Sequence, residues 1–159
     1  MPDEKAMLME QLQMFEELIP KIDAIYGRLT RTFKMMSPIL KKKTFNSDDQ
    51  SVMKDFLHNV HQELEEYGQS LRRGQGERDL LRGEILRLKS QNPKAKDEYA
   101  IVEAELWAAE KNLSVREKGL GHLSELVQLL DSIMRVGEMT EFDERLLTEI
   151  VTDLKNLAE

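Results

Sequence analysis

Apolar residues recur at alternating spacings of three and four along most of this chain, as in an amphipathic helix that packs against other helices. The first run extends from about residue 3 to 37 and contains Pro20, near which we expect a kink. Pro38 is expected to end it. The seam of this first helix consists of Leu8, Leu12, Phe15, Ile19, Ile22, Tyr26, Leu29, Phe33 and Met36.

A second helix is predicted over residues 47–91. Ser47 and Gln50 have the spacing of a capping box, which favours a helix start. Gly74 and Gly76 each cost about 1 kcal/mol relative to alanine inside a helix, so we expect a bend or weak point there. The seam of the second helix consists of Val52, Phe56, Val60, Leu64, Tyr67, Leu71, Leu81, Ile85 and Leu88.

Asn92 and Pro93 have the character of an N-cap and a first-turn proline, which predicts a tight reversal into a third helix over 93–136. Gly137 is expected to cap that helix, and Thr140 with Asp143 to cap a fourth over 140–158. The third seam is Tyr99, Val102, Leu106, Ala109, Leu113, Arg116, Leu120, Leu123, Val127, Leu130 and Met134. The fourth is Phe142, Leu146, Ile150, Leu154 and Leu157.

These elements predict one all-α domain over residues 1–159, a long antiparallel helical coiled-coil bundle of three long helices plus a shorter C-terminal helix. The second and third helices should form an antiparallel hairpin, in which Gly119 and Gly121 allow a further bend. The apolar stripes are wider than a strict seam, because Leu18, Ile25 and Leu126 flank them. We therefore expect a homodimer whose core is completed between chains.

Composition narrows the function classes. One third of the residues are charged, and the net charge of −7 disfavours nucleic acid as a partner. The absence of cysteine excludes a disulfide framework and is consistent with a reducing compartment. The first residues carry acids where a signal or transit peptide would be basic. We expect a cytoplasmic protein that can lie peripherally at a membrane.

Catalytic chemistry finds little support in the sequence. His58, His61 and Glu65 share a helix face, and Asp55 with His58 has the carboxylate-x-x-His spacing of di-iron bundles, but a second such pair is missing. The segment 74–76 lacks the third glycine of a dinucleotide motif, and no Walker loop occurs. We expect no catalytic residue, no bound metal and no cofactor, and hence a protein that is not an enzyme.

A local excess of positive charge runs from Arg72 to Lys96 in this acidic chain. It is the leading functional candidate, since part of it could face an anionic membrane, nucleic acid or an acidic partner; the alternative is a solvated face with salt bridges to the third helix. A lysine loop before Phe45 is a second candidate, in which the phenylalanine enters the lipid interface; the alternative is a plain loop. The candidate residues are Arg72, Arg73, Arg78, Arg82, Lys89, Lys94, Lys96, Lys41, Lys42 and Lys43.

Trp107 adjoins the seam residue Leu106, at the margin of a coiled-coil interface. Packing in the core or in a dimer is one interpretation of this tryptophan, and a platform for a ligand is the other.

The hairpin between the second and third helices resembles that of the BAR superfamily, and most closely the core BAR components of fungal eisosomes. The resemblance spans about residues 60–113. It implies a three-helix coiled-coil protomer, an antiparallel curved dimer that assembles into a lattice, and a basic concave surface for phosphoinositide-rich membrane, with Arg72, Arg73, Arg78 and Arg82 on or near the lipid side. It rests on Arg78, Asp79, Ile85, Leu88, Lys89, Pro93, Glu103, Glu105, Leu106, Ala109 and Glu110.

Two functions follow as hypotheses. The first is a non-enzymatic BAR-like scaffold that dimerises and binds or shapes anionic phospholipid membranes through the basic segment. The second is a coiled-coil adaptor or structural subunit of a multiprotein complex, with other coiled-coil proteins as partners and no direct membrane binding.

Overall fold

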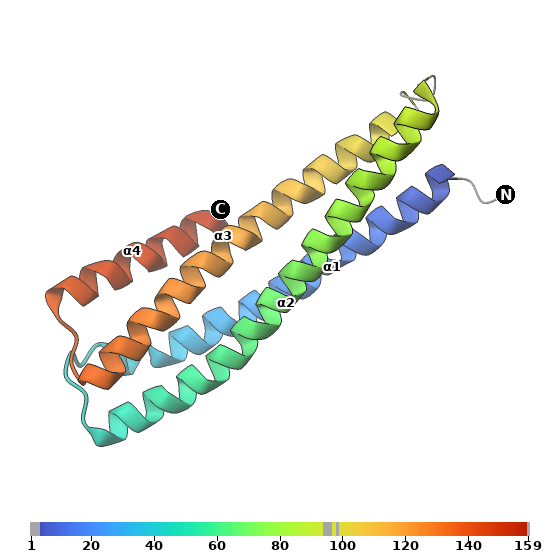
Figure 1. The fold of residues 1–159 in the computed structure, drawn as a ribbon. Helices are drawn as coiled ribbons and strands as arrows, with labels where there is room; N and C mark the ends of the chain where they lie inside the picture. Colours follow the sequence, from blue (N-terminus) through green and yellow to red (C-terminus); the bar gives the residue numbers. More distant parts are fainter. Residues whose placement is uncertain (1–3, 94–96, 98, 159) are drawn as a thin grey trace. The chain divides into compact units, whose positions relative to one another are not determined.

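The computed structural model describes residues 4–93, 97 and 99–158, and these fold almost entirely into α-helix. Four α-helices occur in this part of the chain: α1 (Glu4–Leu40), α2 (Ser47–Gln91), α3 (Ala100–Val136) and α4 (Glu141–Ala158) (Figure 1). No β-strand is formed by these residues, and an isolated bridge pairs Thr44 with Glu138. The predicted all-α class and four-helix content are confirmed.

The helices divide between two compact units. Unit 1 combines α1 up to Asp23 with Gln69–Arg116, and so holds the end of α2 and the beginning of α3. Unit 2 combines Ala24–Gly68 with the chain from Glu117 onward, and so includes α4. The three long helices each contribute to both units, and each unit has its own apolar core.

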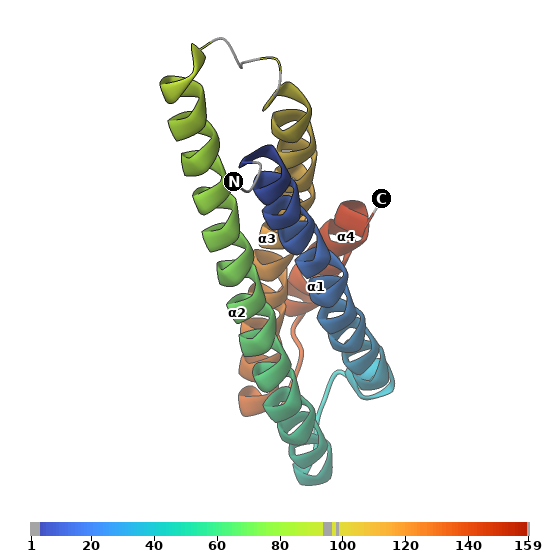
Figure 2. The ribbon, with the colours of Figure 1, turned by 90° about the vertical axis from the view of Figure 1, so that its right-hand side faces the viewer.

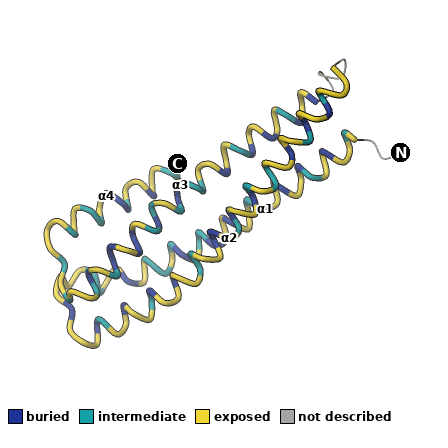
Figure 3. Tube along the Cα trace, viewed as in Figure 1, coloured by how far each residue is buried: buried dark blue, intermediate teal, exposed yellow. Residues whose placement is uncertain are grey.

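The core of unit 1 explains why α2 is not interrupted at its glycines. Gly74 is buried, and a Cβ atom built on it would lie 3.2 Å from Cδ1 of Leu113 on α3. Glycine therefore continues the seam from Leu71 to Leu81 and lets the two helices approach closely. The bend or weak point expected here is replaced by an unbroken helix, whose buried positions line its inner side (Figure 3).

The core of unit 2 is built from the remaining halves of α1, α2 and α3 together with α4, which lies beside α3 (Figure 2). Tyr67 is fully buried, with its ring centroid 6.3 Å from that of Tyr26, and burial raises the pKa of the Tyr26 phenol. Two residues that were predicted to lie in the buried seams are exposed. Val52 is exposed while Met53 is buried, and Phe142 is 71% exposed while Ile150 and Leu154 supply the buried edge of α4.

Two predicted helix ends also differ from the structure. The first helix continues through Pro38 to Leu40. Proline lacks an N–H, so the carbonyl four residues earlier, that of the exposed Lys34, gives up one helical hydrogen bond near the end of the helix. The third helix begins at Ala100 rather than at residue 93. Asn92 donates its backbone N–H to the Leu88 carbonyl at 3.0 Å, and so continues the hydrogen bonding of α2 instead of capping α3.

Helix α2 begins with a capping box one residue earlier than predicted. The Asp49 N–H donates to Asn46 Oδ1 at 2.9 Å, and the Asn46 N–H donates to Asp49 Oδ2 at 3.2 Å. Gln50 is used elsewhere, since its Nε2 donates to the carbonyl of Met134 at 2.9 Å at the end of α3. The predicted pair Thr140 and Asp143 does cap α4, with two reciprocal bonds of 3.1 Å.

Asp49 should make stability depend on pH in the acid range. The Lys42 ammonium, 2.9 Å from Asp49 Oδ1, lowers the pKa of this carboxyl, so its contribution is complete above the unfolded value of about 3.9 and is lost as pH falls through the lower folded value. The free energy of unfolding should therefore differ between the native chain and Asp49→Asn near neutral pH, and the difference should shrink in acid. A pH-independent difference would contradict this expectation. Asp55→Asn, at an exposed position, is the control.

Candidate functional site

The cations of the predicted basic segment are of two kinds: some are exposed without an ion pair in the described chain, and others form ion pairs. Arg72 and Arg73 are exposed, and neither forms an ion pair within the described part of the chain. Arg78 is half-buried, and its Nε lies 3.3 Å from Oδ1 of the neighbouring Asp79. Lys94 and Lys96, the last two candidates in this segment, lie outside the described residues.

The paired cations tie α2 to α3 in unit 1. Arg82 forms a bidentate ion pair with Glu110, in which Nη2 lies 2.7 Å from Oε2, and this bonding raises the pKa of Arg82. Two helical turns further on, Lys89 Nζ lies 2.8 Å from Glu103 Oε1. Arg82 and Lys89 therefore form interhelical salt bridges, which was the alternative interpretation of the basic segment to membrane contact.

A second side of α2 carries cations and an apolar residue together. Residues spaced three and four apart form this side, which we call the α2 outer stripe: Arg73, Gly76, Leu80, Gly83 and Arg87. All five are exposed, and Leu80 is 66% exposed. Arg87 leans toward Glu84, with Nη2 2.8 Å from Oε2. None of the five residues is an acid, but Glu84, the partner of Arg87, lies beside them. Within the described chain, Arg73 is therefore the stripe's cation without an ion pair, and Leu80 is its apolar residue.

The lysine loop does not present its phenylalanine to solvent. Phe45 is 7% exposed and packs into unit 2, so the expectation that it enters a lipid interface is wrong. Lys42 pairs with Asp49, and Lys43 Nζ lies 3.7 Å from Glu144 of α4. Lys41 is exposed and has no ion pair among the residues that the structure describes.

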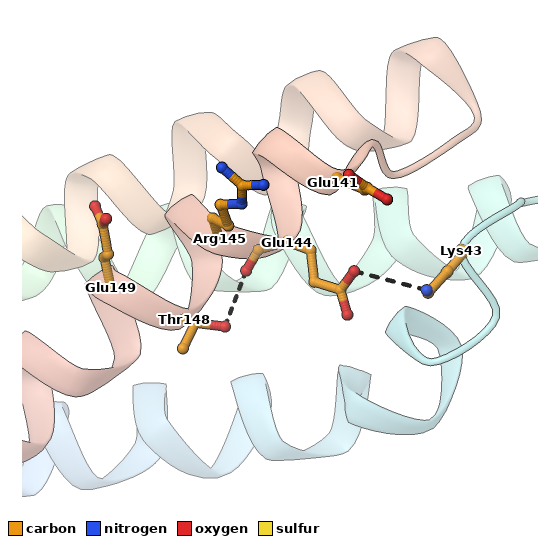
Figure 4. A pocket seen from close by; sticks show the side chains of 6 residues that line it. All are labelled: Lys43, Glu141, Glu144, Arg145, Thr148 and Glu149. Carbon is orange, nitrogen blue, oxygen red and sulfur yellow. Dashed lines mark hydrogen bonds and ion pairs between the residues drawn. The ribbon is translucent and has the colours of Figure 1, made fainter.

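A shallow hollow of about 620 Å³ lies between this loop and the first turns of α4 (Figure 4). Lys43 reaches Glu144 across it, and Arg145 and Glu149 also line it (Figure 4). The lining mixes acids and bases, and the Lys43–Glu144 ion pair is internal to the unit. The hollow therefore has no single sign of charge with which to select a ligand.

Unit 1 carries an apolar groove that the sequence predicted only in part. Leu86 and Trp107 are 66% and 59% exposed, and they line a hollow of about 300 Å³ with Ile85 and Leu106. The ammonium of Lys111 lies 3.6 Å from the Trp107 ring centroid, as in a cation–π contact. The sequence placed Trp107 at the margin of the seam, but Leu86 follows the seam residue Ile85 and carries no separate signal.

The remaining candidates do not form a site. His58, His61 and Glu65 are exposed, and the described residues contain no group of three histidine, aspartate or glutamate side chains placed to hold a metal ion. Among these residues, no helix is long and apolar enough to cross a bilayer. No family model, curated protein or solved structure matches this chain.

Proposed function

We propose that this protein is a non-enzymatic, BAR-like helical scaffold that self-associates and binds anionic membrane surfaces through α2. The observation that carries the proposal is the α2 outer stripe together with Arg72. In a chain with a net charge of −7, this side of α2 exposes Arg72, Arg73 and Leu80 between the flanking acids Asp79 and Glu84, and exposed arginines beside a leucine can meet anionic lipid headgroups. The hairpin resemblance to BAR proteins supports the same function.

Both the positive charge and the exposed hydrocarbon of α2 would contribute to membrane binding. Each basic residue close to an anionic leaflet contributes about 1 kcal/mol, and an exposed leucine adds hydrocarbon that can enter the interface. Arg72 and Arg73 need not break an ion pair within the described chain before they meet a phosphate. Arg82 and Lys89 would have to leave Glu110 and Glu103, so we assign them no primary role in lipid binding.

The test is co-sedimentation of the protein with vesicles that contain phosphatidylserine and a phosphoinositide, at low salt. Arg72→Glu with Arg73→Glu should weaken binding by about 30-fold or more, because two contributions of about 1 kcal/mol are lost and repulsion is added. The control is Arg31→Glu with Lys34→Glu, two exposed cations on α1 that change net charge equally. Equal losses in both variants, or no sedimentation of the native chain, would overturn the proposal.

An adaptor function without membrane contact is the second candidate. It is favoured by the large apolar side chains that the bundle leaves exposed, of which Trp107 and Phe142 are the largest. Such side chains on helices are typical of surfaces that receive another helix. Native protein that stays in the supernatant at low salt would favour this function over the first.

A further inference from the structure

The groove on unit 1 has an ordered distribution of charge. Four residues of α2 at helical spacing face four residues of α3, and we call this surface the α2/α3 groove: Arg82, Ile85, Leu86 and Lys89, with Glu103, Leu106, Trp107 and Glu110. The apolar residues stand in the middle and an ion pair stands at each end. Both cations belong to α2 and both acids belong to α3.

We propose that the α2/α3 groove binds the same groove of a second copy of this chain. The two-fold axis of the pair then runs along the hairpin, so that α2 of each copy lies over α3 of the other. This inference deepens the self-association in the proposed function and rests on it. It differs from the antiparallel dimer that the BAR resemblance implies, because an axis along the hairpin sets the two copies parallel. It specifies the surface, the orientation and the residues that make contact.

Charge decides between the two symmetric orientations. Each ion pair, Arg82 with Glu110 and Lys89 with Glu103, is a dipole directed across the hairpin. A two-fold axis along the hairpin stacks the dipoles of the two copies in opposite directions, which is attractive. An axis across the hairpin would place α2 over α2 with the dipoles aligned, which is repulsive. The groove is therefore complementary to itself in one orientation.

The apolar residues supply the driving force. The ion pairs set Arg82 level with Glu110 and Lys89 level with Glu103, so Leu86 and Trp107, midway between them, lie at nearly the same level of the hairpin. The proposed axis therefore places Leu86 of one copy against Trp107 of the other, twice in each pair. Exposed tryptophan is the residue type most often found as an anchor in interfaces. Eight residues of each copy line the groove, fewer than the roughly 20–30 residues a side of a stable complex, so we expect an association that depends on concentration.

The first experiment measures mass by sedimentation equilibrium over about a hundredfold range of protein concentration. Native protein should show a reversible monomer–dimer equilibrium, and Trp107→Ala should weaken it by about 10-fold or more. Ile101→Ala, an exposed apolar position on α3 outside the groove, is the matched control and should leave the equilibrium unchanged. Because both side chains are exposed, circular dichroism should show the same helix content in all three proteins.

The second experiment tests orientation with cysteines, which the native chain lacks. A mixture of Leu86→Cys and Trp107→Cys proteins should form a disulfide-linked pair under mild oxidation, because the two positions face each other and one native contact remains. Leu86→Cys alone should link far less. Efficient linkage of Leu86→Cys with itself would overturn the orientation, since only an axis across the hairpin brings residue 86 over its own copy.

The outcomes separate this inference from the membrane proposal. Native protein that is monomeric throughout, or a Trp107→Ala protein that dimerises like the native one, overturns the groove as the interface. Vesicle binding by the native chain is measured independently and depends on Arg72 and Arg73. Its failure would remove the membrane function without changing the expected masses.

Discussion

Phe15→Ala should reduce the free energy of unfolding by about 3–5 kcal/mol, one of the two largest losses that we expect from a single change. Phe15 is fully buried in unit 1, where it packs beneath Gly74: a Cβ atom added to that glycine would lie 3.9 Å from Phe15 Cε2. Removing the ring leaves a cavity between helices that the continuous backbone of α1 cannot close. Urea denaturation followed by circular dichroism measures the change.

Phe142→Ala is the matched control, because it deletes the same side chain from a position that is 71% exposed. We expect its effect on the free energy of unfolding to lie within about 0.5 kcal/mol. Similar losses for the two phenylalanines would contradict the burial pattern of both units.

Gly137→Ala should reduce the free energy of unfolding by about 2 kcal/mol, since a residue with a Cβ pays about 1–2 kcal/mol in the left-handed region and a hydrogen bond is disturbed as well. Gly137 has φ of 85°, and its N–H donates to the Ile133 carbonyl at 2.9 Å. An added Cβ would lie 3.1 Å from Nε2 of Gln50, which donates to Met134. Thermal and urea denaturation both report the change.

Gly121→Ala provides the contrast on the same helix. A Cβ at Gly121 would meet nothing within 4 Å, and the residue lies inside α3, so alanine should add about 0.5–1 kcal/mol to the free energy of unfolding. A loss at both glycines would show that the two positions do not differ in backbone conformation as described.

The helices and most of their buried positions could be predicted from the sequence, because period and burial are the same information in an amphipathic helix. The ion-pair partners that join different helices could not be predicted. Arg116 was recognisable as the polar break in the third seam, but its bidentate pair with Asp23, at 3.0 Å for both bonds, joins residues that are 93 apart. Nothing local in the sequence identifies such a partner.

The candidate site, too, could be predicted from the sequence only in part. The excess of positive charge on α2 is a property of composition and was visible. The difference between Arg73, which forms no ion pair within the described chain, and Arg82, which is held by Glu110, depends on how α3 lies against α2. The glycine at 74 was misinterpreted for the same reason, because a seam position occupied by glycine has the appearance of a gap until the opposing Leu113 is placed.

The loops of unit 2 are joined by their backbones. The Phe45 N–H donates to the Gly137 carbonyl at 2.8 Å, and the Met139 N–H donates to the Lys43 carbonyl at 2.7 Å. Because each loop supplies partners to the other, opening either one exposes amides of both to solvent. Residues 43–45 and 137–139 should therefore exchange their amide hydrogens as a single group, and a protease cut in one loop should make the other accessible.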